Sequence, residues 1–296
     1  MTHGLKTRDV VPVPVAAVTT FELIKGRGKR RHVDAENAAE FREQCRLPQD
    51  SRVLLVSVGH DGRLASYWRT RLQSELPQQL ANLGVLGITV PNFSFFTDAP
   101  RTHTIWNRAR MLRCAEEFST AGLSVILHLN ALTNADWDYW GSLLRDHPQH
   151  RYVAKEFQTG LLDPDKSDMA IKELAVLQDK LGRELHPLII GGPRLAAKLP
   201  GYFKHFTIID SKPWMATIKR RLLEAKNGKI KERQHLTDKG ELLDLLLSHN
   251  LEQSTERLAA AFGKKNVMPA QSDPPRADAV SRVVPAKSDK QLQFGY

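Results

Sequence analysis

The sequence predicts a protein of the α/β class, with a parallel β/α-barrel-like domain (complete or incomplete) followed by C-terminal helices and a disordered tail. Short apolar segments rich in β-branched residues alternate with segments of helical length between residues 53 and 210. Such alternation implies parallel strands joined by right-handed crossovers, in a barrel or in an open doubly wound sheet. No glycine-rich nucleotide fingerprint follows the first apolar segment, which favours the barrel.

The N-terminal region, residues 1–34, is predicted to be an arm followed by a basic loop. Pro12 and Pro14 interrupt the strand-like residues 10–18, so this run cannot be a central strand and is expected to be an extended arm. Residues 25–32 read Lys-Gly-Arg-Gly-Lys-Arg-Arg-His, which indicates a flexible loop that either grips phosphates or is simply solvated. Its expected phosphate-binding residues are Lys29, Arg30 and Arg31.

The barrel-like domain is assigned to residues 35–214 and opens with a helix over 35–46, capped by Asp34. Its expected strands are apolar runs of the kind that is buried on both faces, at 53–58, 85–90, 124–129, 152–157, 187–190 and 206–209. The expected helices between them are 66–83, 102–121, 136–146, 166–181 and 194–199, and Pro77 should kink or split the first. A standard barrel has eight units and only about six repeats are found. Either residues 10–18 and the region before Ala35 supply extra strands, or the barrel is incomplete.

The C-terminal part is predicted to be helical and basic, and then disordered. Helices are expected over 215–225, 238–249 and 255–262, with Thr237 and Ser254 as caps of the last two. The basic residues assigned to nucleic-acid binding here are Lys219, Arg220 and Arg221. Residues 263–296 are rich in Pro, Ser, Asp and Lys, which predicts a disordered tail.

Composition narrows the partners and the location. The formal net charge of +10 favours a polyanion such as nucleic acid, DNA or RNA, or else only aids solubility. The two cysteines, Cys45 and Cys114, form neither a disulfide scaffold nor a metal motif. No apolar run reaches the roughly 18 residues of a membrane span, and no signal peptide is evident, so we expect a cytoplasmic protein without a membrane partner. The oligomeric state and any cofactor stay open.

Polar residues follow each predicted strand, and parallel strands would bring them to one rim, where ligands bind. They are His60, Asp61, Arg63, Asn92, Ser94, Asp98, His128, Asn130, Glu156, Gln158, Gly191, Gly192, Asp210, Ser211 and Lys212. Of these, Asp210, Asp98 and Glu156 are the candidate catalytic residues. The candidate substrate-binding residues are Asn92, Ser94, Gly191, Gly192 and Trp214.

Asp210 is the sharpest of these candidates. It ends an apolar strand, where a partly desolvated carboxylate could be a base or a nucleophile, with Trp214 stacking on a planar ligand. Asp210 could equally cap the helix that begins near Pro213. Gly191 and Gly192 would let a ligand approach the backbone closely, as would any tight strand-to-helix turn.

Three other groups have alternative interpretations. Arg108 or Arg110 could pair with Asp98 or hold a phosphate. His60 and His128 do not have the sequence spacing usual for metal ligands, so no metal is predicted. His128 is expected to be a core residue whose ring nitrogens are hydrogen-bonded. The spacing of Trp137 and Trp140 is typical of a core stripe.

Residues 90–126 resemble a family of uncharacterised domains carried by phages, plasmids and other mobile elements. The matching positions are Pro91, Phe93, Ser94, Asp98, Pro100, Asn107 and Arg110, followed by the segment AGLSVIL. Asn92 stands where the family has an acidic residue, which puts acid chemistry there in doubt. The chain is also similar, more weakly, to tRNA-guanine transglycosylase barrels. That similarity would make Asp210 the nucleophile and let Gly191 and Gly192 admit the base, although the zinc-binding cysteines of those enzymes are absent.

Three functions therefore remain open. The first is a mobile-element enzyme that modifies a base or nucleotide through Asp210. The second is a non-catalytic nucleic-acid-binding protein for replication, maintenance or regulation of a plasmid or phage, in which a basic helix from Lys219 to Lys231 makes the contacts. The third is an interaction protein whose tail recruits a partner.

Overall fold

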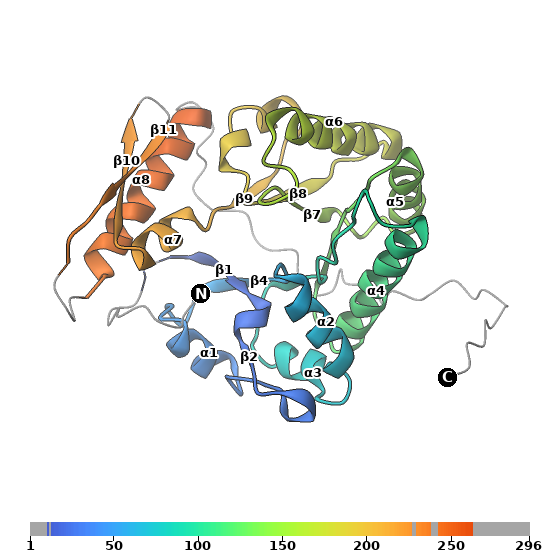
Figure 1. The fold of residues 1–296 in the computed structure, drawn as a ribbon, viewed down its shortest axis with the longest axis horizontal. Helices are drawn as coiled ribbons and strands as arrows, with labels where there is room; N and C mark the ends of the chain where they lie inside the picture. Colours follow the sequence, from blue (N-terminus) through green and yellow to red (C-terminus); the bar gives the residue numbers. More distant parts are fainter. Residues whose placement is uncertain (1–10, 12, 227–228, 238–241, 263–296) are drawn as a thin grey trace.

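A nearly closed barrel of seven parallel strands forms the centre of the protein (Figure 1). The structure is a computed structural model that describes residues 11, 13–226, 229–237 and 242–262. The strands are β1 (Val15–Thr19), β4 (Arg52–Val56), β5 (Gly87–Thr89), β6 (Val125–His128), β7 (Tyr152–Glu156), β8 (His186–Ile190) and β9 (Thr207–Ile209). Each pairs in parallel with the next, while β1 and β9 are the two ends of the sheet. The predicted class, a parallel β/α-barrel-like fold, is confirmed, and the barrel is not fully closed.

Helices cover the outside of this sheet, as expected for βα units. They are α1 (Ala38–Gln44), α2 (Asp61–Thr70), α3 (Leu76–Ala81), α4 (Arg101–Thr120), α5 (Asn134–Asp146) and α6 (Pro164–Leu181). The predicted helix 66–83 is split into α2 and α3, and Pro77 lies in the first turn of α3, where its missing N–H costs nothing. The predicted helix 194–199 is replaced by two 3-10 turns, η3 (Pro193–Leu195) and η4 (Leu199–Gly201).

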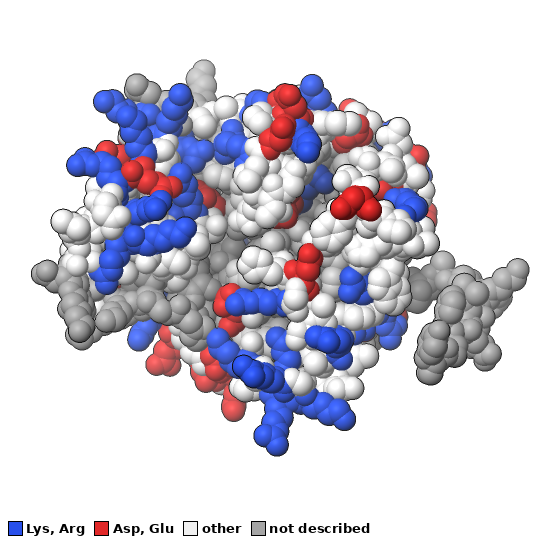
Figure 2. All heavy atoms as spheres, in the orientation of Figure 1, with Lys and Arg blue, Asp and Glu red and all other residues white. Residues whose placement is uncertain are grey.

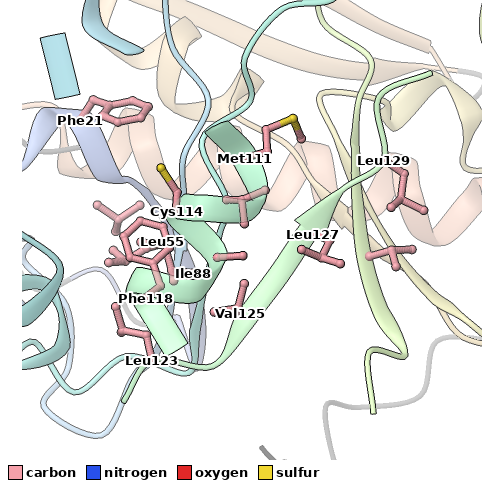
Figure 3. Close-up of a cluster of buried hydrophobic side chains, with 14 of the residues drawn as sticks. Phe21, Leu55, Ile88, Met111, Cys114, Phe118, Leu123, Val125, Leu127 and Leu129 are labelled. Atoms are coloured by element: carbon pink, nitrogen blue, oxygen red, sulfur yellow. The ribbon is translucent and has the colours of Figure 1, made fainter. Parts of the chain in front are cut away.

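Two apolar cores explain the continuous hydrophobic runs of the strands. One core lies between sheet and helices, where Met111, Cys114 and Phe118 of α4 gather with Leu55 and Ile88 of the strands (Figure 3). The other core comes from alternate residues of the same strands. It consists of Val56, Ile126, Ala154, Leu188 and Ile190. Because successive side chains of a strand point to opposite faces, each strand serves both cores.

The N-terminal predictions need three corrections. Residues 15–19 are not an arm but the edge strand β1, which begins just after Pro14 and pairs with β4. The alternative expectation, that residues 10–18 supply an extra strand of the barrel, is confirmed. The basic loop is a small hairpin formed by β2 (Ile24–Lys25), η2 (Gly28–Arg30) and β3 (His32–Val33). Asn37, not Asp34, caps α1, because its side chain accepts from the backbone N–H groups of Ala39 and Glu40.

The C-terminal prediction of helices over 215–225 is wrong beyond its start. Helix α7 (Lys212–Ile218) is followed by an antiparallel hairpin of β10 (Arg221–Lys226) and β11 (Lys229–Gln234). The two later helices are a single helix, α8 (Asp244–Phe262), so Ser254 is interior rather than a cap. Helix α8 packs on β10 and α7. The predicted tail 263–296 lies outside the described residues. Within the described ranges, no helix combines the length and apolar character that a membrane crossing requires.

Candidate functional site

Three of the predicted rim residues meet at the carboxyl ends of β5, β6 and β7. The Asn130 Nδ2 donates to Asn92 Oδ1 at 2.6 Å, and the Asn92 Nδ2 donates to Glu156 Oε2 at 3.3 Å. The other carboxylate oxygen of Glu156, Oε1, accepts the backbone N–H groups of Gln158 and Thr159 at 2.9 and 3.1 Å. Both Glu156 oxygens are therefore occupied, and the residue shapes the loop after β7.

A tier of buried polar groups lies at the strand ends next to this network. The hydroxyls of Thr20 and Ser57 are 2.8 Å apart, and the Ser57 N–H donates to Thr89 Oγ1 at 2.8 Å. All three residues are fully buried. Sequence inspection missed them because a lone Ser or Thr at the end of a strand carries no distinguishing pattern.

His128 lies inside the barrel beside this tier. It is in register with Ala154, a residue of the inner core, and is completely buried. Neither ring nitrogen has a hydrogen-bond partner among the described residues. His128 is therefore a core residue, as expected, but the expectation that its nitrogens are hydrogen-bonded is wrong. Burial, assisted by the charge of Lys155, lowers the pKa of His128 to about 3, so the ring is neutral at pH 7. In the described part of the chain, no three His, Cys, Asp or Glu residues are grouped to hold a metal.

Gly191 and Gly192 allow the backbone after β8 to pack closely against neighbouring side chains of the same chain. Gly191 has a φ of +73°, and a Cβ there would lie 2.0 Å from Gln158 Cγ. A Cβ on Gly192 would lie 2.6 Å from Ile189 Cγ2. The turn after β8 thus requires glycine to pack against the loop after β7, and no ligand need be invoked to explain it.

Asp210 holds the C-terminal elements together. Its Oδ1 accepts the backbone N–H of Lys212 at 2.9 Å, at the start of α7. Its Oδ2 accepts the hydroxyl of Ser254 on α8 at 2.8 Å. One oxygen therefore accepts from the first residue of α7, although the N-cap residue of that helix is Ser211 rather than Asp210. The other oxygen docks α8. Trp214 is half-buried in α7, close to these contacts in sequence, and forms no hydrogen bond with Asp210.

We expect Asp210→Ala to lower the free energy of unfolding by about 1–3 kcal/mol, because it leaves the Lys212 amide and the Ser254 hydroxyl without their hydrogen-bond acceptor. Asp210→Asn keeps an acceptor oxygen and should cost less. The exposed Asp98 serves as the control, and Asp98→Ala should change stability by at most about 0.5 kcal/mol. Urea unfolding of the three variants measures this, and equal losses at the two positions would rule out the fastening role.

The segment from Asn92 to Arg110 is organised differently from its prediction. Asp98 is exposed before α4, and Arg108 pairs with Asp136 at 2.9 Å instead of with Asp98. The Ser94 hydroxyl donates to Asp61 Oδ1 at 2.8 Å, which ties the loop to the start of α2. Neither Asp98 nor Asp210 is hydrogen-bonded to the Asn92–Asn130–Glu156 network, so only some of the predicted rim residues lie together.

The β2–β3 hairpin places Lys29 and Arg30 in solvent. Arg31 is half-buried, and its Nη1 donates to Ser66 Oγ of α2 at 2.9 Å. The Val33 N–H donates to Gln79 Oε1 of α3 at 2.7 Å. The cations of this region are therefore held on an ordered scaffold.

The β10–β11 hairpin has one face buried and one face basic. Leu223 is fully buried, and its N–H donates to Asn250 Oδ1 of α8 at 2.8 Å. Strand alternation and the register put the neighbours of Leu223 on the opposite face. The charged residues of that opposite face, hereafter the basic face, are Lys226, Lys229, Lys231, Arg233 and Glu224. Figure 2 shows Lys and Arg gathered over this hairpin, at the upper left.

Glu224 offsets only part of this charge. It pairs with Arg233 at 2.7 Å, and the three lysines form no ion pair with the described residues. The cations predicted at 219–221 lie at the root of the hairpin. Lys219 is exposed, Arg220 is half-buried, and Arg221 pairs with Glu232 at 2.7 Å. Sequence inspection found the basic segment but gave it helical rather than strand geometry.

The chain matches no protein-family model, and the search of curated proteins finds no significant match. The resemblance of residues 90–126 to mobile-element domains therefore stays a prediction.

Proposed function

We propose that this protein binds nucleic acid non-catalytically, with the barrel as a scaffold and the basic face of the β10–β11 hairpin as a phosphate-binding surface. The observation that carries the proposal is the concentration of Lys226, Lys229, Lys231 and Arg233 on one exposed face with a single carboxylate. The setting that the resemblance suggests is the replication, maintenance or regulation of a mobile element.

Strand geometry favours phosphate backbones as the ligand of this face. Side chains that alternate along two paired strands form a grid of cations about 5–7 Å apart, a spacing similar to that of successive phosphates. Each phosphate that a lysine neutralises releases condensed counterions, which makes the binding free energy strongly dependent on salt. The buried opposite face, held by Asn250 and α8, keeps the grid rigid.

A base-modifying enzyme is supported less well. The catalytic hypothesis needs Asp210 free to act, whereas both of its oxygens accept structural hydrogen bonds. Glu156 is likewise occupied by Asn92 and two backbone N–H groups. These contacts favour the scaffold interpretation of the barrel.

The triple variant Lys226→Glu/Lys229→Glu/Lys231→Glu should weaken binding to a mixed-sequence duplex on the order of 100-fold near physiological salt. The slope of log affinity against log salt should become shallower by about one for each lysine replaced. Fluorescence anisotropy at several salt concentrations measures both quantities, and circular dichroism checks the fold.

The matched control changes the same net charge on α6, through Lys166→Glu/Lys172→Glu/Lys180→Glu. These three lysines are exposed. The control should change binding by less than about 5-fold, since distant surface charges are screened within roughly 8–10 Å. Equal weakening by both triple variants would reduce the proposal to a net-charge effect. Binding by the wild type that does not depend on salt, or no binding at all, would overturn it.

A further inference from the structure

An aromatic surface without an assigned role lies where α2 meets α4. Trp106 of α4 is 55% exposed, an unusual state for the largest apolar side chain. It borders Trp68 of α2, whose ring centroid lies 6.1 Å away. Phe93 lies behind Trp68 at 6.2 Å. We call Trp68, Phe93, Trp106 and Arg110 the Trp106 ledge.

The contacts of Trp68 fix the inner ring of the ledge. The rings of Trp68 and Trp106 are nearly perpendicular, at 84°, so neither covers the other face to face. The Arg71 guanidinium lies 3.6 Å over Trp68 and is itself held by Glu117 at 2.6 Å. A ring fixed in this way loses little conformational entropy when a ligand stacks on it.

Arg110 gives the ledge a positive charge without a carboxylate partner. Its guanidinium carbon lies 4.0 Å from the Phe93 centroid and 6.0 Å from the Trp106 centroid. Its side chain donates to Asn107 Oδ1, and among the described residues it makes no salt bridge, while its Nε is buried without a partner. The Asp61 carboxylate acts on this cation from beyond ion-pair distance, and the groups in direct contact with it are ring faces and the Asn107 side chain. Part of its positive charge is therefore left to attract an anion.

Exposed cations lie on α2 and on the β2–β3 hairpin, which contact each other. Arg69 is exposed on α2, one residue after Trp68. The bond of Arg31 to Ser66 then joins α2 to the hairpin that carries Lys29 and Arg30. Figure 2 shows blue side chains gathered in this lower part of the molecule as well as over the β10–β11 hairpin.

We infer that the Trp106 ledge binds unpaired bases of single-stranded nucleic acid by stacking, and that Arg69, Lys29 and Arg30 bind the phosphates of the same strand. The inference rests on the proposed function and adds the form of the nucleic acid. Exposed aromatic rings interleaved with cations are how single strands are bound without base specificity. A duplex hides its base faces, so it would use the basic face of the β10–β11 hairpin alone.

The test compares Trp106→Ala, Trp106→Phe and Ile105→Ala on an oligonucleotide of about 20 nucleotides, longer than the site of one small domain, and on its duplex. Trp106→Ala should weaken single-strand binding roughly 5- to 150-fold, leave duplex binding unchanged, and leave the salt slope unchanged because stacking releases no counterions. Trp106→Phe should restore most of the affinity. Ile105, 47% exposed on the same helix, is the apolar control and should have no effect.

The outcomes separate this inference from the proposed function. If the wild type binds the duplex with salt dependence and Trp106→Ala changes neither ligand, the ledge inference fails and the proposed function stands. If Ile105→Ala weakens binding as much as Trp106→Ala, the surface is an apolar docking face and the inference also fails. If the wild type binds neither nucleic acid, the proposed function fails first.

Discussion

Replacing Asp136 with asparagine should lower the free energy of unfolding by about 3–5 kcal/mol, the usual cost of breaking a buried ion pair from one side. Asp136 is fully buried at the start of α5. Its Oδ1 lies 2.9 Å from Arg108 Nη1 and 2.7 Å from Arg101 Nη2. Its Oδ2 accepts the backbone N–H groups of Leu132 and Thr133 at 3.0 and 3.1 Å. A neutral amide would leave the Arg108 side chain, only 10% exposed, without a counter-charge.

Asp138, on the same helix, supplies the control for this prediction. It is 67% exposed and lies 3.5 Å from Lys180, so Asp138→Asn should change stability by at most about 0.5 kcal/mol. Urea unfolding of both variants gives the comparison. Similar losses in the two would show that the Asp136 network contributes no more than a surface pair.

The same network should make stability fall in strong acid. Burial raises the pKa of Asp136, but the hydrogen bonds from Arg101 and from the backbone outweigh it and bring the pKa to about 2. The contribution is complete above the ordinary pKa of 3.8 and is lost as the pH falls through about 2. The difference in unfolding free energy between wild type and Asp136→Asn should therefore shrink between pH 4 and pH 2.

The barrel was predictable because its strands are buried on both faces. Residues 53–58 and 187–190 read as unbroken apolar runs, since Leu55 and Ile189 face the helices while Val56 and Leu188 face the barrel interior. Helices such as α5 and α6 have one apolar packing face, so their helical period is clear. The sequence predicts these elements correctly because the local apolar pattern agrees with the packing of the sheet and the helices in the folded protein.

The β10–β11 hairpin was mistaken for a helix for a physical reason. Residues 221–234 are rich in Leu, Glu, Lys and Arg, all good helix formers. The Asn-Gly dipeptide at 227–228, which lies outside the described residues, is a strong hairpin signal and was the better guide. Strand alternation is masked here because Leu223 alone is buried on β10.

The candidate site was predictable in position but not in its contacts. Parallel strands do bring Asn92, Asn130 and Glu156 together. The partner of Asp210 is Ser254, far along the chain on a helix whose packing no local pattern encodes. The Trp106 ledge was missed because exposure of a tryptophan in a helix depends on what packs beside it, which sequence periodicity alone does not determine.

His128→Leu should stabilise the protein, and the gain should grow as the pH falls. At pH 8 the leucine replaces an imidazole whose two buried nitrogens lack partners, a gain of about 1–3 kcal/mol. The unfolded chain takes up a proton on His128 near the ordinary pKa of 6.5, whereas the folded chain does so only near 3. Above pH 6.5 this difference in proton uptake does not affect the stability of the wild type. As the pH falls from 6.5 toward 3, protonation of the unfolded chain lowers the free energy of unfolding of the wild type by up to about 4 kcal/mol.

The stability difference between wild type and His128→Leu isolates this residue, because burial also lowers the pKa of His150 and His186 to about 4 and their effects cancel in the difference. Unfolding by urea at pH 8, 6 and 4.5 measures it, with His60→Leu, an exposed position at the start of α2, as the control. A difference that stays constant across this pH range would mean that His128 is protonated equally in the folded and unfolded chains. It would then have to contact water or an acceptor, and the interior of the barrel would be a wet, accessible space instead of an apolar core.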